Sequence, residues 1–249
     1  MRTIELAGKK VELYDDIEAL PIARFHKYNK MLLVEAGIGS DLAGFDTRIE
    51  KAIRFSRSKT PQYAATELEN LRQSVYFIQN ELSPKYLAFA VLVKSIDGNP
   101  CNGLSDEGLQ RTISLLQDVP NNEMTAQLEA VKKKIDEELR IYFPRLFDDA
   151  SEKEYYDKLK LRAMVMLDGI LNDEKAKPDE LDDELITYSK PQCFTGRDSV
   201  EISYDKQFES MCLILGKNLH TDPKKFSVLE YYNAYEYLKE ENKRLSRKR

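Results

Sequence analysis

The first fourteen residues alternate between apolar and polar side chains, a period of two that is typical of β-strands. Thr3–Leu6 and Lys10–Tyr14 carry the alternation, and Ala7-Gly8-Lys9 between them suits a tight turn. Residues 1–14 are therefore predicted to form an N-terminal β-hairpin. Because an isolated hairpin is only marginally stable in water, it must lie either on the helices of its own chain or on a neighbouring subunit. In the second case Val11 and Leu13 are predicted to contact the partner.

From Asp15 onward the apolar residues recur every three or four positions, which indicates amphipathic helices. One predicted helix runs from a cap at Asp16 to Gly37, and Ser40 or Asp41 is the predicted cap of the next. Thr60-Pro61 begins a third. Its apolar residues have the 4-3-4-3-4 spacing of a helix-packing seam: Ala64, Leu68, Leu71, Val75, Ile78 and Leu82.

The middle of the chain contains one run, Tyr86–Val93, that is apolar on every side. We predict a buried helix at the centre of the fold, because Ser83-Pro84 is a helix start. Residues 97–103 are predicted to be a loop, and Ser105 opens a capping box in which Gly108 stands where Glu or Gln would serve better. After Pro120 a second seam is predicted: Leu128, Val131, Ile135, Leu139 and Tyr142.

Beyond Phe143-Pro144 the pattern is less regular. Ser151 is the predicted cap of a helix with Tyr155, Leu159, Ala163, Met166, Leu167 and Ile170 on one side. The acidic segment 172–183 is predicted to be a loop or mobile arm, and residues 188–204 to hold a second short hairpin. Two helices over residues 205–216 and 226–244 complete the chain.

The fold class predicted from these patterns is mainly α, a multi-helix bundle with an N-terminal β-hairpin. The predicted division is the hairpin at 1–14, a helical bundle at 15–143 and a second helical part at 151–249. A weak boundary falls at 144–150. One continuous domain is the alternative.

Composition agrees with a folded and soluble protein. Of the 249 residues 42% are hydrophobic and 33% charged, and the formal net charge of -5 argues against general nucleic-acid binding. The three cysteines show no CxxC spacing, so reduced thiols are expected. The N-terminus lacks the apolar core of a signal peptide and no stretch is long enough to span a bilayer, so no membrane contact is expected.

Candidate chemistry is sparse. Gly37–Asp41 lacks the third glycine of a dinucleotide fingerprint and the Gly-Lys pair of a P-loop. His26 and His220 stand apart without metal-ligand spacing. The acidic cluster 179–184 lacks the central glycine of an EF-hand, although a metal-dependent hydrolase using Asp182 and Asp183 remains an alternative. We predict that the chain is not an enzyme and takes no cofactor or metal.

The last predicted helix is rich in tyrosine and ends in a basic segment. Tyrosine suits protein interfaces, so the predicted partner-binding residues here are Tyr231, Tyr232, Tyr235 and Leu238. A core-facing aromatic stripe is the alternative. The cations of the basic end stabilise a helix C-terminus or bind phosphate weakly and with strong salt dependence; they are Lys243, Arg244, Arg247, Lys248 and Arg249.

Two segments carry a resemblance. Tyr14–Lys30 together with Gly37–Asp41 resembles a stretch of uncharacterised proteins from the structural gene regions of tailed bacteriophages, notably crAss-like ones. Phe226–Lys239 is similar to short helices in phage tail-assembly and tail-completion proteins. The resemblance implies a non-enzymatic structural protein, made in the host cytoplasm and located in the virion, where it forms a ring or connector near the portal or tail.

The partners that this resemblance implies are copies of the chain itself in a cyclic homo-oligomer and neighbouring virion proteins. Weak contact with packaged DNA is predicted from the basic C-terminus itself. Two alternatives stay open, namely a chaperone of phage tail or virion assembly, and a packaged protein associated with nucleic acid.

Overall fold

The N-terminal hairpin forms as the alternating pattern predicts. The computed structural model describes residues 1–42, 44–80, 83–147, 150–172, 179–188 and 190–246. In it β1 (Arg2–Leu6) and β2 (Lys9–Leu13) pair antiparallel. The turn residues Ala7 and Gly8 both have positive φ, 47° and 75°, as in the type I′ turns whose twist matches that of the strands.

A second hairpin extends this sheet, and the prediction of a loop over residues 97–103 is wrong in its first half. β3 (Val93–Ile96) pairs with β2, and β4 (Asn99–Pro100) pairs with β3, giving the order β1-β2-β3-β4. The turn is Asp97-Gly98, again with positive φ at both residues, and Asp-Gly is a strong hairpin signal. The register places Val11 opposite Ile4 on one side and opposite Ile96 on the other.

The centre of the fold is α4 (Pro84–Leu92), the buried helix that the apolar run predicts. It packs against α1 (Ile22–Ile38), α5 (Asp106–Leu115) and α6 (Asn121–Tyr142). The predicted seam of α6 is buried at Leu128, Val131, Ile135 and Leu139, whereas Tyr142 is exposed. α1 begins after Pro21 rather than at Asp16, whose carboxylate instead accepts a hydrogen bond from the backbone N–H of Ala19 in the preceding turn.

The pair formed by α2 (Phe45–Arg57) and α3 (Gln62–Gln79) corrects a second prediction. Leu68, in the predicted apolar seam of α3, is 56% exposed, whereas Glu67 is 2% exposed. Arg48 and Lys51 of α2 explain the difference, because their cations lie 4.0 and 3.8 Å from the Glu67 carboxylate. A polar stripe therefore faces inward where apolar periodicity predicts leucine. Leu82 lies outside the described residues.

Residues 179–183 of the acidic segment are helical, which corrects the prediction of a loop or arm for that part. α8 (Asp179–Tyr188) lies beside α7 (Ala150–Leu171), and Pro178 falls outside the described residues. Two ion pairs join the helices, Arg162 with Asp182 and Lys158 with Glu184. Cations on α7 thus pair with carboxylates of a segment that the sequence pattern predicts to be a solvated loop. α7 begins at Ala150, so Ser151 is not its cap.

The stretch predicted to hold a second hairpin contains no strand in its described residues. It crosses the end of α1, where Phe194 is buried beside Val34 and Ile38, and α9 (Val200–Leu219) begins earlier than predicted. The Phe194 ring occupies the space over Gly37: a Cβ added there would lie 2.1 Å from the ring. Gly37 is therefore part of helix packing rather than a helix stop.

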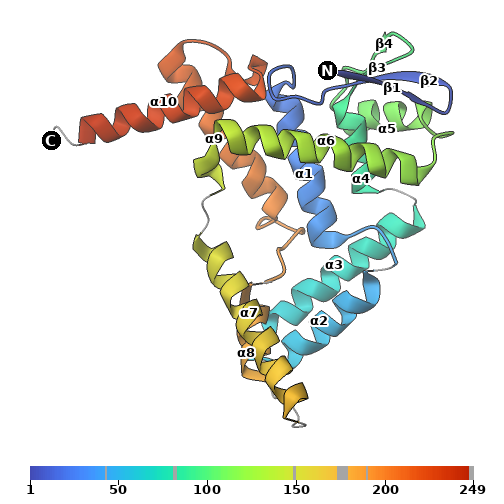
Figure 1. Ribbon diagram of the computed structural model, residues 1–249. Helices are drawn as coiled ribbons and strands as arrows, with labels where there is room; N and C mark the ends of the chain where they lie inside the picture. The colour runs from blue at the N-terminus through green and yellow to red at the C-terminus, as the bar shows by residue number, and fades with distance from the viewer. Residues whose placement is uncertain (43, 81–82, 148–149, 173–178, 189, 247–249) are drawn as a thin grey trace.

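α10 (Val228–Ser246) closes the fold. Figure 1 shows α1, with α9 alongside it, running from the layer that holds the sheet, α5, α6 and α10 toward α2 and α3, and α7 and α8 lie beside α2. The described residues on both sides of 144–150, where a short 3₁₀ helix spans Pro144–Leu146, share one apolar core. Its members include Val11, Ile135, Leu215 and Val228.

Candidate functional site: an aromatic pocket and an uncovered helix face

The start of α10 is fixed against the start of α1. The Ile22 N–H donates to the Phe226 carbonyl (2.8 Å), and the Val228 N–H donates to the Leu20 carbonyl (2.9 Å). A capping box at Ser227 and Glu230 satisfies two further N–H groups of the first turn. The two segments that carry the phage resemblance, far apart in sequence, are thus hydrogen-bonded to each other.

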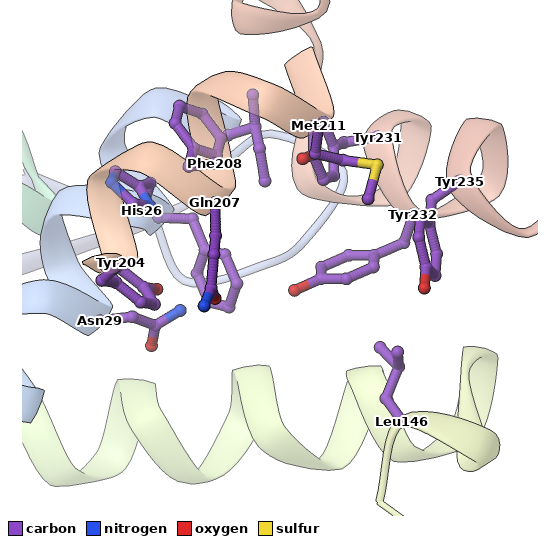
Figure 2. Close-up of a pocket in the computed structure, with 12 residues that line it drawn as sticks. His26, Asn29, Leu146, Tyr204, Gln207, Phe208, Met211, Tyr231, Tyr232 and Tyr235 are labelled. Atoms are coloured by element: carbon purple, nitrogen blue, oxygen red, sulfur yellow. The ribbon is translucent and has the colours of Figure 1, made fainter. Parts of the chain in front are cut away.

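A cavity of about 300 Å³, here called the aromatic pocket, lies between α1, α9 and α10. Figure 2 shows aromatic side chains from all three helices around it, with Leu146 reaching it from the side opposite α9 and α10. Each helix contributes residues spaced to share one face. They include Phe25, His26 and Asn29 from α1, Tyr204, Gln207 and Phe208 from α9, and Tyr231, Tyr232 and Tyr235 from α10.

His26 is held on both ring faces. Its imidazole stacks between Tyr204 (centroids 4.5 Å apart) and Phe208 (4.0 Å), as Figure 2 shows. Nε2 lies 2.9 Å from Oδ1 of Asp205. The other carboxylate oxygen, Oδ2, accepts a hydrogen bond from Lys30 (2.7 Å). Burial lowers the pKa of His26, and the bond to Asp205 opposes this only in part. The imidazole is therefore neutral at pH 7 and joins α1 to α9.

The Asp205 carboxyl group beside His26 is ionised at neutral pH, whereas the tyrosine hydroxyls that line the pocket are not. Burial raises the pKa of Asp205, but the hydrogen bonds from Lys30 and His26 outweigh it, so the pKa lies below its ordinary value. Burial raises the pKa of Tyr204 to about 12 and also raises the pKa values of Tyr231 and Tyr232. The phenols are neutral, so the pocket presents uncharged rings that suit stacking and apolar contact.

The structure places the predicted partner-binding residues mostly inside the chain. Val11 and Leu13 have no exposed surface because the sheet and helices cover them. This corrects the prediction that they face a partner. Tyr231 and Leu238 are also buried, at 7% and 9% exposure, as in a core-facing stripe. The half-buried Tyr232 and Tyr235 line the aromatic pocket.

The basic end is described only in part. Lys243 and Arg244 are exposed in the last turn of α10, where cations interact favourably with the helix dipole. Arg247, Lys248 and Arg249 lie outside the described residues. Of the candidate hydrolase carboxylates, Asp182 is paired with Arg162, and the Asp183 side chain is not among the described ones.

Within the described part of the chain, α7 leaves a broad apolar surface uncovered. The sequence predicts Ala163, Leu167 and Ile170 on the same side as Tyr155 and Leu159, but the structure separates the two groups. Tyr155, Leu159 and Arg162 face α2 and α8 across a shared cavity. The other side of α7, here called the α7 face, is exposed and carries Tyr156, Ala163, Met164, Leu167, Ile170 and Leu171. The signal in the sequence is that α7 has apolar residues on more than one stripe, so one packing partner cannot cover them all.

Comparison with known proteins found no matching family model, curated protein or solved structure. Within the described ranges no helix is long and apolar enough to cross a membrane. Among the described side chains no cluster of three or more His, Cys, Asp or Glu residues is placed to hold a metal ion.

Proposed function

We propose that the chain is a non-enzymatic structural protein of a tailed-phage virion, a subunit of a ring or connector near the portal or tail. The observation that carries the proposal is the α7 face. Ile170 and Leu171 are 74% and 80% exposed, and Tyr156 and Leu167 are each 58% exposed, on one helix of the free subunit. Contiguous apolar surface of this kind marks protein interaction sites.

The phage assignment is supported by the two segments that resemble phage proteins. They pack together at the start of α1 and α10, where Phe25 contacts Tyr232 with ring centroids 6.5 Å apart. Such a joint fixes the direction in which α10 leaves the body, as Figure 1 shows. A rigid terminal helix is a suitable element for reaching an adjoining component.

Two measurements test this function. The mass of the purified protein, determined by light scattering across a concentration series, is expected to correspond to more than one chain. Mass spectrometry of particles purified from phage-producing cultures is expected to find the chain at a fixed stoichiometry. A strict monomer that is absent from purified particles would contradict the proposal.

The α7 face also suits an assembly chaperone, which would use it to hold another component temporarily. The two functions differ in one observable: a chaperone is present in lysates and precursor particles and absent from mature particles. Salt-dependent DNA binding that is lost when residues 243–249 are deleted would instead support the nucleic-acid-associated alternative.

A further inference from the structure

The α7 face has the spacing of a helix-pairing seam. Tyr156, Lys160, Ala163, Leu167 and Ile170 follow one another at intervals of 4, 3, 4 and 3 residues, and all are exposed. This is the spacing by which two helices pack side by side over several turns. Met164 and Leu171, 54% and 80% exposed, flank the seam on one side.

The area of the face approaches one partner's share of a standard interface. A helix of 22 residues is about 33 Å long. The five large apolar side chains of the face are between 54% and 80% exposed. At ~200 Å² for a fully exposed large side chain, they leave roughly 650 Å² uncovered. One partner contributes ~800 Å² to a standard protein interface, and the face is as large as the largest apolar patches found on monomers.

The charged residues on and beside the seam favour a second copy of the same helix in the antiparallel direction. Lys160 interrupts the apolar seam, and Asp168 lies eight residues later at the edge of the face, next to Met164 and Leu171. In a parallel pair Lys160 of one copy would lie opposite Lys160 of the other, and the like charges would repel. In an antiparallel pair centred at Met164, Lys160 would lie beside Asp168 of the second copy. Two such pairs form around the two-fold axis.

We propose that the α7 face pairs antiparallel with the α7 face of a second copy of this chain. The small Ala163 at the centre of the seam lets the two helix backbones approach closely. The contact is isologous and does not by itself close a ring. The pair is then the repeating unit from which a larger assembly is built. This inference rests on the proposed function only in that both require self-association.

Association is tested first with charge placed in the seam. Leu167→Glu is expected to weaken the dimer at least 100-fold in sedimentation or light-scattering titrations while helix content by circular dichroism is retained. Leu213→Glu, at a 74% exposed leucine of α9, is the matched control and is expected to leave the dimer intact. Equal effects of the two substitutions, or a wild-type monomer at all concentrations, would overturn the pairing.

Direction is tested by cross-linking with a short bismaleimide in a Cys101→Ser, Cys193→Ser background, in which Cys212 is buried. Ala163→Cys is expected to give cross-linked dimers. Tyr156→Cys and Ile170→Cys are expected to give none, because each would lie ~20 Å from its counterpart. Cross-linking at all three positions would show a parallel pair and refute the antiparallel arrangement.

A charge swap gives an independent check. Lys160→Asp alone and Asp168→Lys alone are each expected to weaken the dimer, and the double variant is expected to restore it. If the protein is an oligomer whose stability does not change with any α7 substitution, this inference is refuted, whereas the proposed function is not contradicted. A monomer absent from virions refutes both.

Discussion

Arg24 provides the sharpest test of how the core is held together. Its side chain is 5% exposed and reaches from α1 to the end of α4 and the second hairpin. Nη1 donates to the carbonyls of Val91 (2.7 Å) and Val93 (3.1 Å), and Nη2 donates to the carbonyl of Cys101. One guanidinium thus joins the last turn of α4 to the start of β3 and to the residue that follows β4. Arg24→Met keeps the length of the side chain and removes every donor.

The expected cost follows from opposing terms. Each hydrogen bond to a charged group contributes about 1.5–3 kcal/mol, and three are lost. The methionine no longer requires several kcal/mol for desolvating a cation. The net loss is about 3 kcal/mol in the free energy of unfolding, and Tm falls by roughly 6–12 °C for a chain of this size. Arg24→Lys is expected to lose less than Arg24→Met, because its ammonium can still donate to a carbonyl. It is still expected to lose stability, because an ammonium cannot reproduce the planar fork.

The assay is thermal unfolding at fixed protein concentration and pH, followed by circular dichroism or calorimetry. Arg111→Met, at an exposed arginine of α5, is the control and is expected to change Tm by less than about 2 °C, as surface substitutions usually do. An Arg24→Met protein that unfolds within that same margin of the wild type would refute the reasoning. It would show that the three carbonyls lose nothing with the arginine.

Three further substitutions test separate features. Burial lowers the pKa of His26, so its contribution to stability is complete above pH ~6.5 and is lost as the pH falls. The free energy of unfolding in urea should therefore fall between pH 7.5 and 5 in the wild type, and His26→Gln should make this fall smaller. Glu67→Gln should lower the free energy of unfolding by about 2 kcal/mol, because the half-buried cations of Arg48 and Lys51 lose their buried carboxylate. The control Glu69→Gln, at a more exposed pair, should lower it by less than ~0.5 kcal/mol. Both are measured by urea unfolding. Gly37→Ala should lose about 1–3 kcal/mol through overpacking; Gly44→Ala, with ordinary contacts, should not, and equal Tm values would contradict this.

Local periodicity predicted the elements that bury one apolar face. The first hairpin and the first four residues of the α6 seam were predicted correctly, because their apolar residues recur with a single period that matches the surface the core covers. β3 was missed because Val93 belongs to the same apolar run as α4, so no change of period marks the end of the helix. Only Asp97-Gly98 signalled the hairpin.

Long-range contacts explain the features that the pattern left obscure. Gly108 is a poor capping-box residue, yet a Cβ at that position would lie 2.8 Å from the backbone of Gly103. Close backbone approach, and not capping, therefore requires the glycine. The buried Glu67 of α3 is explained only by cations on α2. Neither contact produces a periodic pattern in the sequence, because each depends on how separate segments of the chain pack together.

The same limit applies to the candidate site. The α10 and α7 stripes both read as apolar residues at helical spacing, so the sequence could not decide which one its own chain covers. α10 is covered because Phe226 and Val228 are hydrogen-bonded beside α1, which turns Tyr231 toward α9 and the core. α7 meets α2 and α8 on one side only. The proposed partner surface is therefore on a helix that its own chain covers on one side only, and not on the one richest in tyrosine.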